Sequence, residues 1–279
     1  MKKSESEINK KKDTSWESVA GWYDELLAGD DTYQTKVLLP NLLRLVAPKG
    51  KKIIDIACGQ GFFAKAFADS DAAQVVGVDL SPQLIQIAKK SETEKLRFGV
   101  SSANNISLRE CVGEAMYTLT GNGSFDVATI VLALQNIKDM SGTFKEAARL
   151  LKPDGIFVIV LNHPAFRIPK ASAWGFDEAE KIQYRRVDRY GLPFTIEVDM
   201  NPGEKEVGKK VHTVSFHRPL QDYFKALASA GFSVDGLEEW ISHKKSEEGP
   251  RAKAEDQSRK EFPMFLTLIA RKNHEKEIE

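Results

Sequence analysis

The chain has 279 residues, and its 40 Lys and Arg residues are balanced by 40 Asp and Glu residues. A chain without net charge has no overall field that would hold a polyanion, so a general nucleic-acid-binding role is disfavoured, although a local basic patch remains compatible with this balance. No apolar run approaches the roughly 20 residues that a membrane-spanning helix needs. Cys58 and Cys111 are too few for a disulfide framework or a metal cluster, so we expect reduced thiols, no metal site and a cytoplasmic protein.

The first segments of the chain divide into a tail and two helices. Residues 1–15 are rich in Lys, Glu and Ser and lack the apolar core of a signal peptide, so they are expected to form a disordered tail. Residues 16–279 are expected to form a single domain. Apolar side chains at helical spacing predict a helix over 16–27 and a second over 32–50, in which Pro40 implies a kink or a restart.

A regular alternation of strands and helices follows. Strand character is found at 51–57, 73–80, 95–100, 125–134 and 155–161, with helices predicted at 62–68, after Ser81 and Pro82, and at 143–155. Strands that are apolar throughout are buried on both faces, as in a parallel sheet covered by helices.

The C-terminal part of the chain adds a helix closed by Gly231 and two strands, at 233–241 and 262–272, which suit a hairpin at one edge of the sheet. The predicted fold is therefore α/β: a Rossmann-like, doubly wound, mostly parallel sheet with a C-terminal antiparallel hairpin edge and helices on both faces.

Two segments interrupt this alternation. Residues 162–217 contain four prolines and many aromatic residues, and a stretch of this length inside a domain is typical of a lid or a substrate-covering insertion. Residues 242–261 are rich in Lys, Glu and Ser, and we interpret them as a polar insertion that forms a solvated loop.

The first strand-to-helix turn, "IIDIACGQGFF", has the chemistry of a ligand site. Gly59 and Gly61 lack a Cβ that would obstruct a ligand, and the helix beginning near Phe62 directs its N–H groups at the turn. Ala64 also fits the third position of the dinucleotide pattern G-x-G-x-x-G/A, so a nicotinamide cofactor is not excluded. Asp55, however, would repel a pyrophosphate and attract an ammonium group.

Asp79 ends the second strand, "VVGVDL". An acid at this position accepts hydrogen bonds from ribose hydroxyls in several nucleoside-binding classes. It therefore predicts a nucleoside without specifying which one.

Together, four motifs resemble the class I S-adenosylmethionine-dependent methyltransferases. They are "IIDIACGQG", "VVGVDLSPQLIQIAKK", the segment beginning "SFDVATIVLALQN", and "RLLKPDGIFVIV". They cover roughly Ile53 to Leu161, and "FHRPLQDYFKALASAGF" extends the likeness. The segments are similar in particular to ubiquinone- and menaquinone-pathway methyltransferases. Four landmarks in the family's order and spacing make the resemblance specific.

The resemblance implies a set of cofactor contacts. The methionine part of S-adenosylmethionine would be held by Asp55, Ala57, Gly59 and Gly61, the ribose by Asp79, and the adenine by Leu80. The family often has Gly-Asp-Ala after the third strand as the adenine's polar partner, and this sequence departs from that pattern. Ser102 and Ala103 follow the strand directly and are preferred, while Glu114 and Ala115 remain the alternative.

Substrate residues are expected among the segments that cover the carboxyl ends of the strands. His163 lies just past the fifth strand, and His217 closes the 162–217 insertion. Either imidazole would suit a general base at neutral pH, and we assign the catalytic role to His163. Further candidates for the acceptor site are Trp16, Trp22, Tyr23, Gln135 and Asn136, with Arg167, Arg185 and Arg186 for an acidic substrate.

The function predicted from the sequence is methyl transfer from S-adenosylmethionine to a small-molecule acceptor, by O- or C-methylation of an aromatic or quinone-like compound. "NHPAF" differs from the Asn-Pro-Pro-aromatic motif of nucleic-acid amino-methylating enzymes in its strand and its prolines, which favours a small molecule. The alternatives are an RNA or protein methyltransferase, an NAD-dependent oxidoreductase, or a cofactor-binding protein without activity. The sequence leaves the oligomeric state open.

Overall fold

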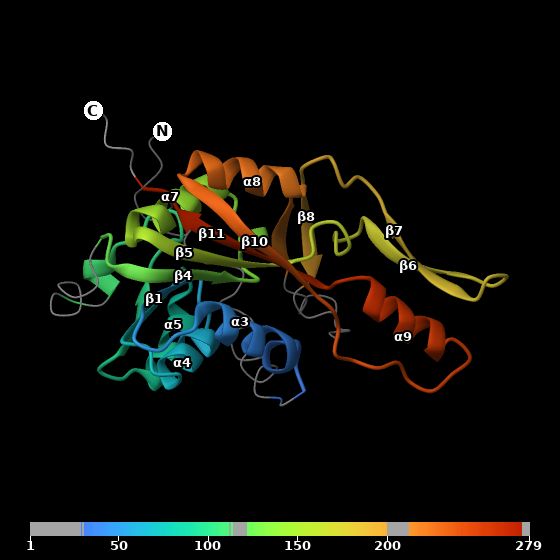
Figure 1. Cartoon of the computed structure of the whole chain (residues 1–279), viewed down its shortest axis with the longest axis horizontal. Coiled ribbons are helices and arrows are strands. Elements are labelled where there is room, and N and C mark those ends of the chain that lie inside the picture. The colour runs from blue at the N-terminus through green and yellow to red at the C-terminus, as the bar shows by residue number, and fades with distance from the viewer. Residues whose placement is uncertain (1–28, 30, 112, 114–121, 200–211, 275–279) are drawn as a thin grey trace, which may run out of the picture.

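The computed structural model describes residues 29, 31–111, 113, 122–199 and 212–274. Its centre is a seven-stranded sheet with the order β10-β11-β5-β4-β1-β2-β3 (Figure 1). The strands are β1 (Lys52–Ile56), β2 (Gln74–Asp79), β3 (Leu96–Val100), β4 (Phe125–Val131), β5 (Leu151–Asn162), β10 (Phe232–Trp240) and β11 (Phe265–Lys272). Strands β1 to β5 pair in parallel, whereas β11 runs antiparallel to both β5 and β10. The predicted fold class is confirmed.

Helices cover both faces of the sheet and create two apolar cores. In Figure 1, α7 (Met140–Leu150) and α8 (Leu220–Ser229) lie on one face, with α3 (Leu39–Val46), α4 (Phe62–Asp69) and α5 (Pro82–Ala88) on the other. Adjacent residues of a strand point to opposite faces. Ile54 therefore packs in the core that contains Phe144 of α7, while Ile53 packs in the core that contains Phe67 of α4. None of the described helices is both long and apolar enough to cross a bilayer.

The helix boundaries follow local sequence signals. The π-helical turn η3 (Gln34–Leu38) passes directly into α3, whose first turn contains Pro40, so the predicted kink or restart corresponds to a change from π- to α-helical geometry. Ser81 caps α5 by accepting the N–H of Leu84 at 3.3 Å. Short 3₁₀ turns occur at η4 (Lys89–Ser91) and η5 (Leu134–Asn136). The predicted tail at 1–15 and helix at 16–27 lie outside the described residues.

The predicted helix at 143–155 extends too far. Helix α7 ends at Leu150, and β5 begins at Leu151. Phe125 pairs with Leu151, yet Val127 pairs with Ile156, so the intervening residues bulge out of the ladder. Pro153 accounts for the early end, because a proline disfavours helical geometry at the residue before it.

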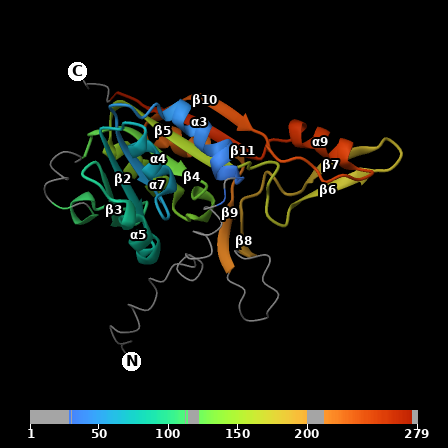
Figure 2. The same ribbon diagram turned by 90° about the horizontal axis from the view of Figure 1, so that it is seen from below.

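The 162–217 segment contains two hairpins. Strand β6 (Ser172–Asp177) pairs with β7 (Ile182–Val187), and β8 (Phe194–Asp199) pairs with β9 (His212–His217). The β6–β7 hairpin extends away from the main sheet, whereas β8 and β9 project from the underside of the molecule as it is drawn in Figure 2.

Residues 242–261 are not a loop throughout, because they include helix α9 (Ala252–Glu261), which lies beside β7. This helix could not be predicted from an apolar periodicity, because it is polar on most of its surface. Arg251, immediately before it, places its guanidinium 4.3 Å from the centre of the Phe176 ring on β6.

Phe98 on β3 explains two glycines of the fold. Its ring is fully buried, and a Cβ at Gly61 would lie 2.5 Å from its Cζ, while a Cβ at Gly77 would lie 2.6 Å from its Cδ1. Both glycines therefore make room for one aromatic side chain, since contacts this short do not occur between packed atoms.

We predict that Gly61→Ala destabilises the fold by about 1–3 kcal/mol from overpacking, in addition to the strain of its backbone. Gly50→Ala is the matched control, because Gly50 has a similar positive φ of +74° but no atom within 4 Å of an added Cβ. Urea unfolding of both variants measures the difference, and Phe98→Leu should restore part of the stability lost in Gly61→Ala. Equal losses in the two glycine variants would contradict the assignment to Phe98.

Candidate functional site

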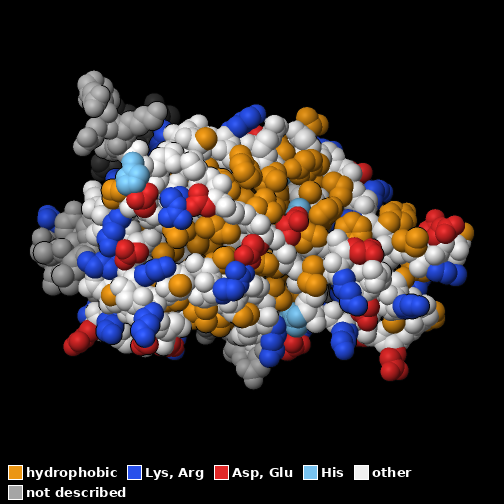
Figure 3. Space-filling view, in the orientation of Figure 1, with side chains coloured by type: hydrophobic (Ala, Val, Ile, Leu, Met, Phe, Trp, Pro, Cys, Tyr) orange, Lys and Arg blue, Asp and Glu red, His pale blue; other side chains and the backbone are white. Residues whose placement is uncertain are grey.

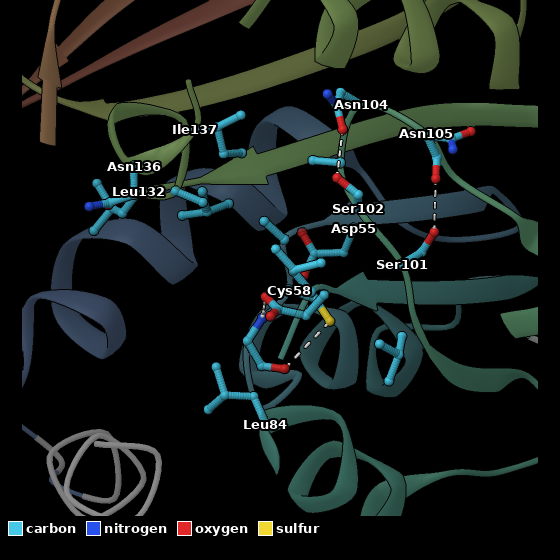
Figure 4. A pocket seen from close by; sticks show the side chains of 18 of the residues that line it. Asp55, Cys58, Leu84, Ser101, Ser102, Asn104, Asn105, Leu132, Asn136 and Ile137 are labelled. Atoms are coloured by element: carbon cyan, nitrogen blue, oxygen red, sulfur yellow. Dashed lines mark hydrogen bonds between the residues drawn. The ribbon is translucent and has the colours of Figure 1, made fainter. Parts of the chain in front are cut away.

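A cavity of about 1350 Å³ opens at the carboxyl ends of the parallel strands. It lies where the chain order of the strands reverses, with β1 between β2 and β4, and ligands of doubly wound sheets bind at this switch point. Its walls come from the segments that follow β1, β2, β3 and β4. Figure 4 shows Asp55 and Cys58 deep in the cavity, with Leu132 and Asn136 to one side and Ser101 and Asn105 to the other.

Asp55 lines the deep end of this cavity. Its side chain is 1% exposed, and Oδ1 accepts the hydroxyl of Thr129 at 2.7 Å. Its second carboxyl oxygen, Oδ2, is buried without a hydrogen-bond partner. The pKa of Asp55 is raised to about 7, chiefly by burial and to a smaller extent by the charge of Asp79, while the Thr129 hydroxyl and the Ala64 N–H act in the opposite direction. An unpaired buried carboxyl oxygen in a cavity wall is suited to a cationic donor such as an ammonium group.

Asp79 connects the two turns that form the near wall. Its Oδ2 accepts the N–H of Gly59 and its Oδ1 accepts the N–H of Ser81, each at 2.9 Å. Burial raises its pKa, and these backbone hydrogen bonds act in the opposite direction. Because each carboxylate oxygen has two lone pairs, both oxygens keep capacity for a ligand hydroxyl.

The two glycines of the turn have different roles. Gly59 lines the cavity, and a Cβ placed on it would meet no atom within 4 Å, so its open side is available to a ligand. Gly61 does not line the cavity, and its lack of a side chain serves the contact with Phe98. The structure therefore gives no support to the expectation that Gly61 contacts the cofactor.

Two strained backbone positions lie at the cavity. Ala57 after β1 and Leu132 after β4 have positive φ values of +55° and +53°, and both line the cavity. A positive φ costs a residue with a Cβ about 1–2 kcal/mol, so the surrounding structure must hold both turns in place.

The predicted adenine side of the site also lines the cavity. Leu80 is 51% exposed there, and Ser102 and Ala103 follow β3 along the same wall. The hydroxyl of Ser102 donates to Asn104 Oδ1 at 2.6 Å, and Asn104 in turn donates to Asp139 at the start of α7. The alternative pair, Glu114 and Ala115, lies outside the described residues.

Several cavity residues were not predicted. Phe62 and Phe63 at the start of α4 line the cavity, as do three residues of β9 in the insertion: Thr213, Val214 and Phe216. No local pattern indicates β9, because its contact depends on how the insertion folds back.

Two side chains join the insertion to the loop after β4. Asn136 Nδ2 donates to the carbonyl of Val214 at 3.0 Å. Arg218 donates to the carbonyls of Leu134, Ile137 and Lys138, at 3.3, 2.7 and 2.9 Å. The loop that carries Leu132 is therefore fixed by the end of the insertion. Gln135, another acceptor-site candidate, does not line the cavity and donates to the Leu132 carbonyl.

The side chains of the two candidate histidines make hydrogen bonds away from the cavity. His163 is 4% exposed and does not line the cavity. Its Nδ1 accepts the N–H groups of Ala165 and Phe166 at 3.2 Å, so its Nε2 carries the proton and donates to Glu239 at 2.7 Å. Burial lowers the pKa of His163, and this effect outweighs the hydrogen bond and charge of Glu239, which raise it. This geometry gives no support to His163 as the base. His217 donates from Nε2 to the carbonyl of Tyr190 and is also absent from the cavity wall.

The remaining candidates are placed as follows. Arg167 and Arg185 line a second, smaller pocket, whereas Arg186 is exposed and paired with Asp188. Trp16, Trp22 and Tyr23 lie outside the described residues.

Cys58 and Cys111 are free thiols, and the part of the chain that the structure describes contains no cluster of His, Cys, Asp and Glu arranged for a metal ion. Burial, followed by the charges of Asp55 and Asp79, holds the pKa of Cys58 well above its usual range, so this thiol stays protonated.

Comparison with known proteins identifies the domain. A family model described as a methyltransferase domain matches residues 54–159. The ubiquinone biosynthesis O-methyltransferases of Stutzerimonas stutzeri and Xanthomonas axonopodis pv. citri are 33% and 30% identical over 134 and 139 residues, each alignment covering 48% of this chain and 52% of the relative. The chain thus spans about half the length of these curated relatives. A solved S-adenosylmethionine-dependent methyltransferase from Mesorhizobium loti is 25% identical, with 87% of this chain and 99% of that chain covered and a TM-score of 0.62.

The fold, the cavity and these matches define the class of the matched domain, that of the class I S-adenosylmethionine-dependent methyltransferases. Residues 54–159 belong to the methyltransferase domain family, and S-adenosylmethionine is the cofactor of this domain. The family resemblance and the cofactor expected from the sequence are confirmed.

The raised pKa of Asp55 predicts a pH-dependent stability. The folded value of about 7 exceeds the ordinary 3.8, so the native state binds more protons between these values. The free energy of unfolding of the wild type therefore falls as pH rises from about 4 to 7. Asp55→Asn removes this loss and should become the more stable protein above pH 7, by at most about 4 kcal/mol.

Thermal unfolding without ligand at pH 5 and pH 8 tests this prediction. Asp126→Asn is a control of opposite sign. The pKa of Asp126 is lowered overall: burial opposes the shift, but the Lys152 ion pair and the Lys52 N–H prevail. Asp126→Asn should therefore lose stability relative to wild type at pH 8. An Asp55→Asn protein that is equally destabilised at both pH values would contradict the assigned pKa.

Proposed function

We propose that this chain transfers a methyl group from S-adenosylmethionine to a small-molecule acceptor, by O- or C-methylation of an aromatic or quinone-like compound. The single observation that carries the proposal is the unpaired, buried carboxyl oxygen of Asp55 at the switch-point cavity. It is suited to the ammonium group of a zwitterionic amino acid, whereas the pyrophosphate of a dinucleotide would be repelled there.

The residues around this carboxylate fit the remaining parts of the cofactor. Ala57 and Gly59 would border the amino-acid part, and Asp79 would accept the ribose hydroxyls with its free lone pairs. Leu80 would cover the adenine, with Ser102 and Ala103 beside it. When bound, the sulfonium supplies an activated methyl group and a neutral leaving group.

The chain's own contribution to the reaction is positioning and the exclusion of water. In-line displacement from a good leaving group needs alignment more than acid–base chemistry. Among the described residues that line the cavity there is no histidine. Asp139 is a poor base because the Asn104 and Gly142 hydrogen bonds lower its pKa. The proposed acceptor is therefore a group that loses its proton readily, such as an acidic phenol or a C–H group made acidic by its neighbours.

We propose that residues 162–217 form the substrate-covering insertion of a single domain. The contributions of Thr213, Val214 and Phe216 to the cavity wall support this assignment. The ubiquinone-pathway relatives support a quinone-like acceptor by analogy only, because they match half of this chain.

Calorimetry with S-adenosylhomocysteine tests the cofactor site. Asp55→Asn and Asp79→Ala should each weaken binding roughly 10- to 100-fold, because each removes hydrogen bonds to a charged group. Wild-type affinity should also fall as pH decreases below about 7, since Asp55 must then lose a proton before it can pair with the ammonium group. Asp126→Asn, which alters an acid paired with Lys152 at the other end of β4, should bind like wild type. Equal affinity in all four proteins would contradict the site.

A screen of methyl-donor consumption tests the acceptor class. We expect turnover with phenols or hydroquinones at a rate that Asp55→Asn lowers strongly, and none with amines, RNA or protein. Labelled product in the RNA fraction alone would replace the small-molecule acceptor with a nucleic acid. NADH binding in place of S-adenosylhomocysteine binding would instead indicate an oxidoreductase.

A further inference from the structure

A second pocket, with a volume of about 110 Å³, lies beside the ends of β5 and β11. We refer to it as the arginine pocket, because Arg167, Arg185 and Arg259 line it together with the aromatic side chains of Phe166, Trp174 and Phe262. No carboxylate is among its described lining residues. Three guanidinium groups around one small space without an acid are electrostatically unfavourable until an anion enters.

Arg167 is the central cation of the pocket. Its Nη1 donates to Asn162 Oδ1 at 2.5 Å, and its guanidinium lies 5.4 Å from the centre of the Phe265 ring. Its Nε and Nη2 donate to no residue that the structure describes. Burial, together with the nearby positive charge of Arg185, lowers the pKa of Arg167 despite the opposing effect of Tyr33. A partly desolvated guanidinium with free donors is the feature that recognises carboxylates and phosphates.

Arg185 is held in position by neutral groups, whereas Arg259 contacts both a hydroxyl and a carboxylate. Arg185 donates to the Phe166 carbonyl and to the Ser172 hydroxyl, each at 2.7 Å, and its guanidinium lies 4.9 Å from the Trp174 ring centre. Arg259 reaches Ser246 Oγ at 3.3 Å and has its nearest acid, Asp256, at 3.9 Å. The fork of Arg185 is therefore fixed without neutralisation of its charge.

The aromatic walls make the pocket rigid. Phe262 meets both Phe166 and Trp174 edge to face, with ring centres 5.4 Å apart in each pair. His163 supports the same wall, because its ring stacks on Phe166 and its Nδ1 holds the turn that leads to Arg167. His163 thus has a structural role, because it holds this turn in its conformation.

The charge is local to the pocket. Around it, the outer end of the molecule built from β6, β7 and α9 carries Lys, Arg, Asp and Glu side chains side by side (Figure 3). Such a mixed surface has no field that would gather polyanions. The small volume likewise favours a single anionic group over an extended polymer.

The pocket lies on the same edge of the sheet as the cofactor cavity. Val131 at the end of β4 lines that cavity and pairs with Val160 of β5, and Phe265 beside Arg167 pairs with Asn162 two residues further along β5. Two strand spacings, together with two residues along the strands, separate Val131 from Phe265, which is roughly 12 Å between their backbones. An acceptor that is bound at both sites bridges this distance.

We propose that the arginine pocket binds the carboxylate or phosphate group of the methyl acceptor, so that the acceptor is an anionic aromatic compound. The assignment to an acceptor rests on the proposed function, whereas the recognition of an anion rests on the pocket alone. Arg167 and Arg185 bind the two oxygens, and Phe166, Trp174 and Phe262 enclose the carbon skeleton next to them.

The first experiment measures anion binding to the full-length protein by calorimetry, with benzoate and phenyl phosphate as probes. We expect Arg167→Gln and Arg185→Gln to weaken binding of at least one probe about tenfold or more. Arg186→Gln is the matched control, because Arg186 neighbours Arg185 on β7 but is exposed and paired with Asp188. It should bind like wild type. Failure of both probes to bind wild type, or equal binding by wild type and Arg167→Gln, would overturn the proposal.

Folding of the variants is controlled in the same samples. Arg167→Gln should unfold at a temperature no lower than wild type, since it removes an uncompensated charge, and benzoate should raise the unfolding temperature of wild type more than that of the variant. Arg167→Lys retains the charge without the planar fork and should bind with intermediate affinity. If Arg167→Gln fails to fold, Arg185→Gln decides the outcome by the same comparison.

The second experiment assigns the anion to the acceptor. Hydroxylated benzoates and their neutral methyl esters are compared as acceptors. Arg167→Gln should raise KM for the acids about tenfold, leave KM for the esters unchanged and leave the affinity for S-adenosylhomocysteine unchanged. Arginine-dependent benzoate binding that does not compete with any acceptor would overturn the assignment, since the anion would then be a separate ligand. Loss of S-adenosylhomocysteine binding in wild type, with anion binding intact, would refute the proposed function and leave the anion site.

Discussion

The site depends on one electrostatic constraint, the burial of the Asp55 carboxylate with one oxygen unpaired. Burial of a charge without a partner destabilises a folded protein, and here it raises the pKa of Asp55 to about 7. The hydroxyl of Thr129 compensates one oxygen only. A cationic group in the cavity is what relieves the other. The strained backbones of Ala57 and Leu132 lie around the same space. The free-energy costs of backbone strain and of an unpaired carboxylate are thus both located where the cofactor is expected to bind.

The parallel sheet explains why these groups converge, and the insertion explains how the site is closed. Strands β1, β2 and β4 end at one edge, which brings Asp55, Asp79 and Leu132 to one cavity although they are far apart in sequence. The far wall is different in origin. It comes from β9, and Arg218 ties it to the loop after β4 through three carbonyl groups. The architecture of the sheet therefore forms the wall where we propose that the donor binds, and the folding of a segment outside the sheet shapes the space proposed for the acceptor.

The sequence predicted the residues whose roles follow from their immediate neighbours. Asp55 and Gly59 follow a buried strand, and an acid ending the next strand completes the pattern, so their approach to one cavity could be foreseen. Gly61 could not be assigned in this way, because a missing Cβ makes room equally well for a ligand or for Phe98, and only the packing distinguishes them. The environment of His163 could not be predicted for a similar reason: its position past β5 fits a base, but the turn that occupies its Nδ1 is a tertiary feature. Helix α9 was missed because its surface is mostly polar and its docking partner is the β6–β7 hairpin.

The arginine pocket and Asp55 show that a chain without net charge can still contain unpaired charged side chains. The chain is neutral overall, yet it keeps an unpaired carboxylate in Asp55 and an unpaired guanidinium in Arg167 on the same edge of the sheet. Strands β4 and β5 separate them, so they do not neutralise each other. In a protein whose only requirement was stability, such charges would be replaced by apolar residues or paired with each other. Two unpaired charges of opposite sign instead create a site with polarity along its length, in which a zwitterionic donor is held at the acidic end and an anionic acceptor at the basic end. This arrangement fixes the relative orientation of two ligands without any residue that touches both.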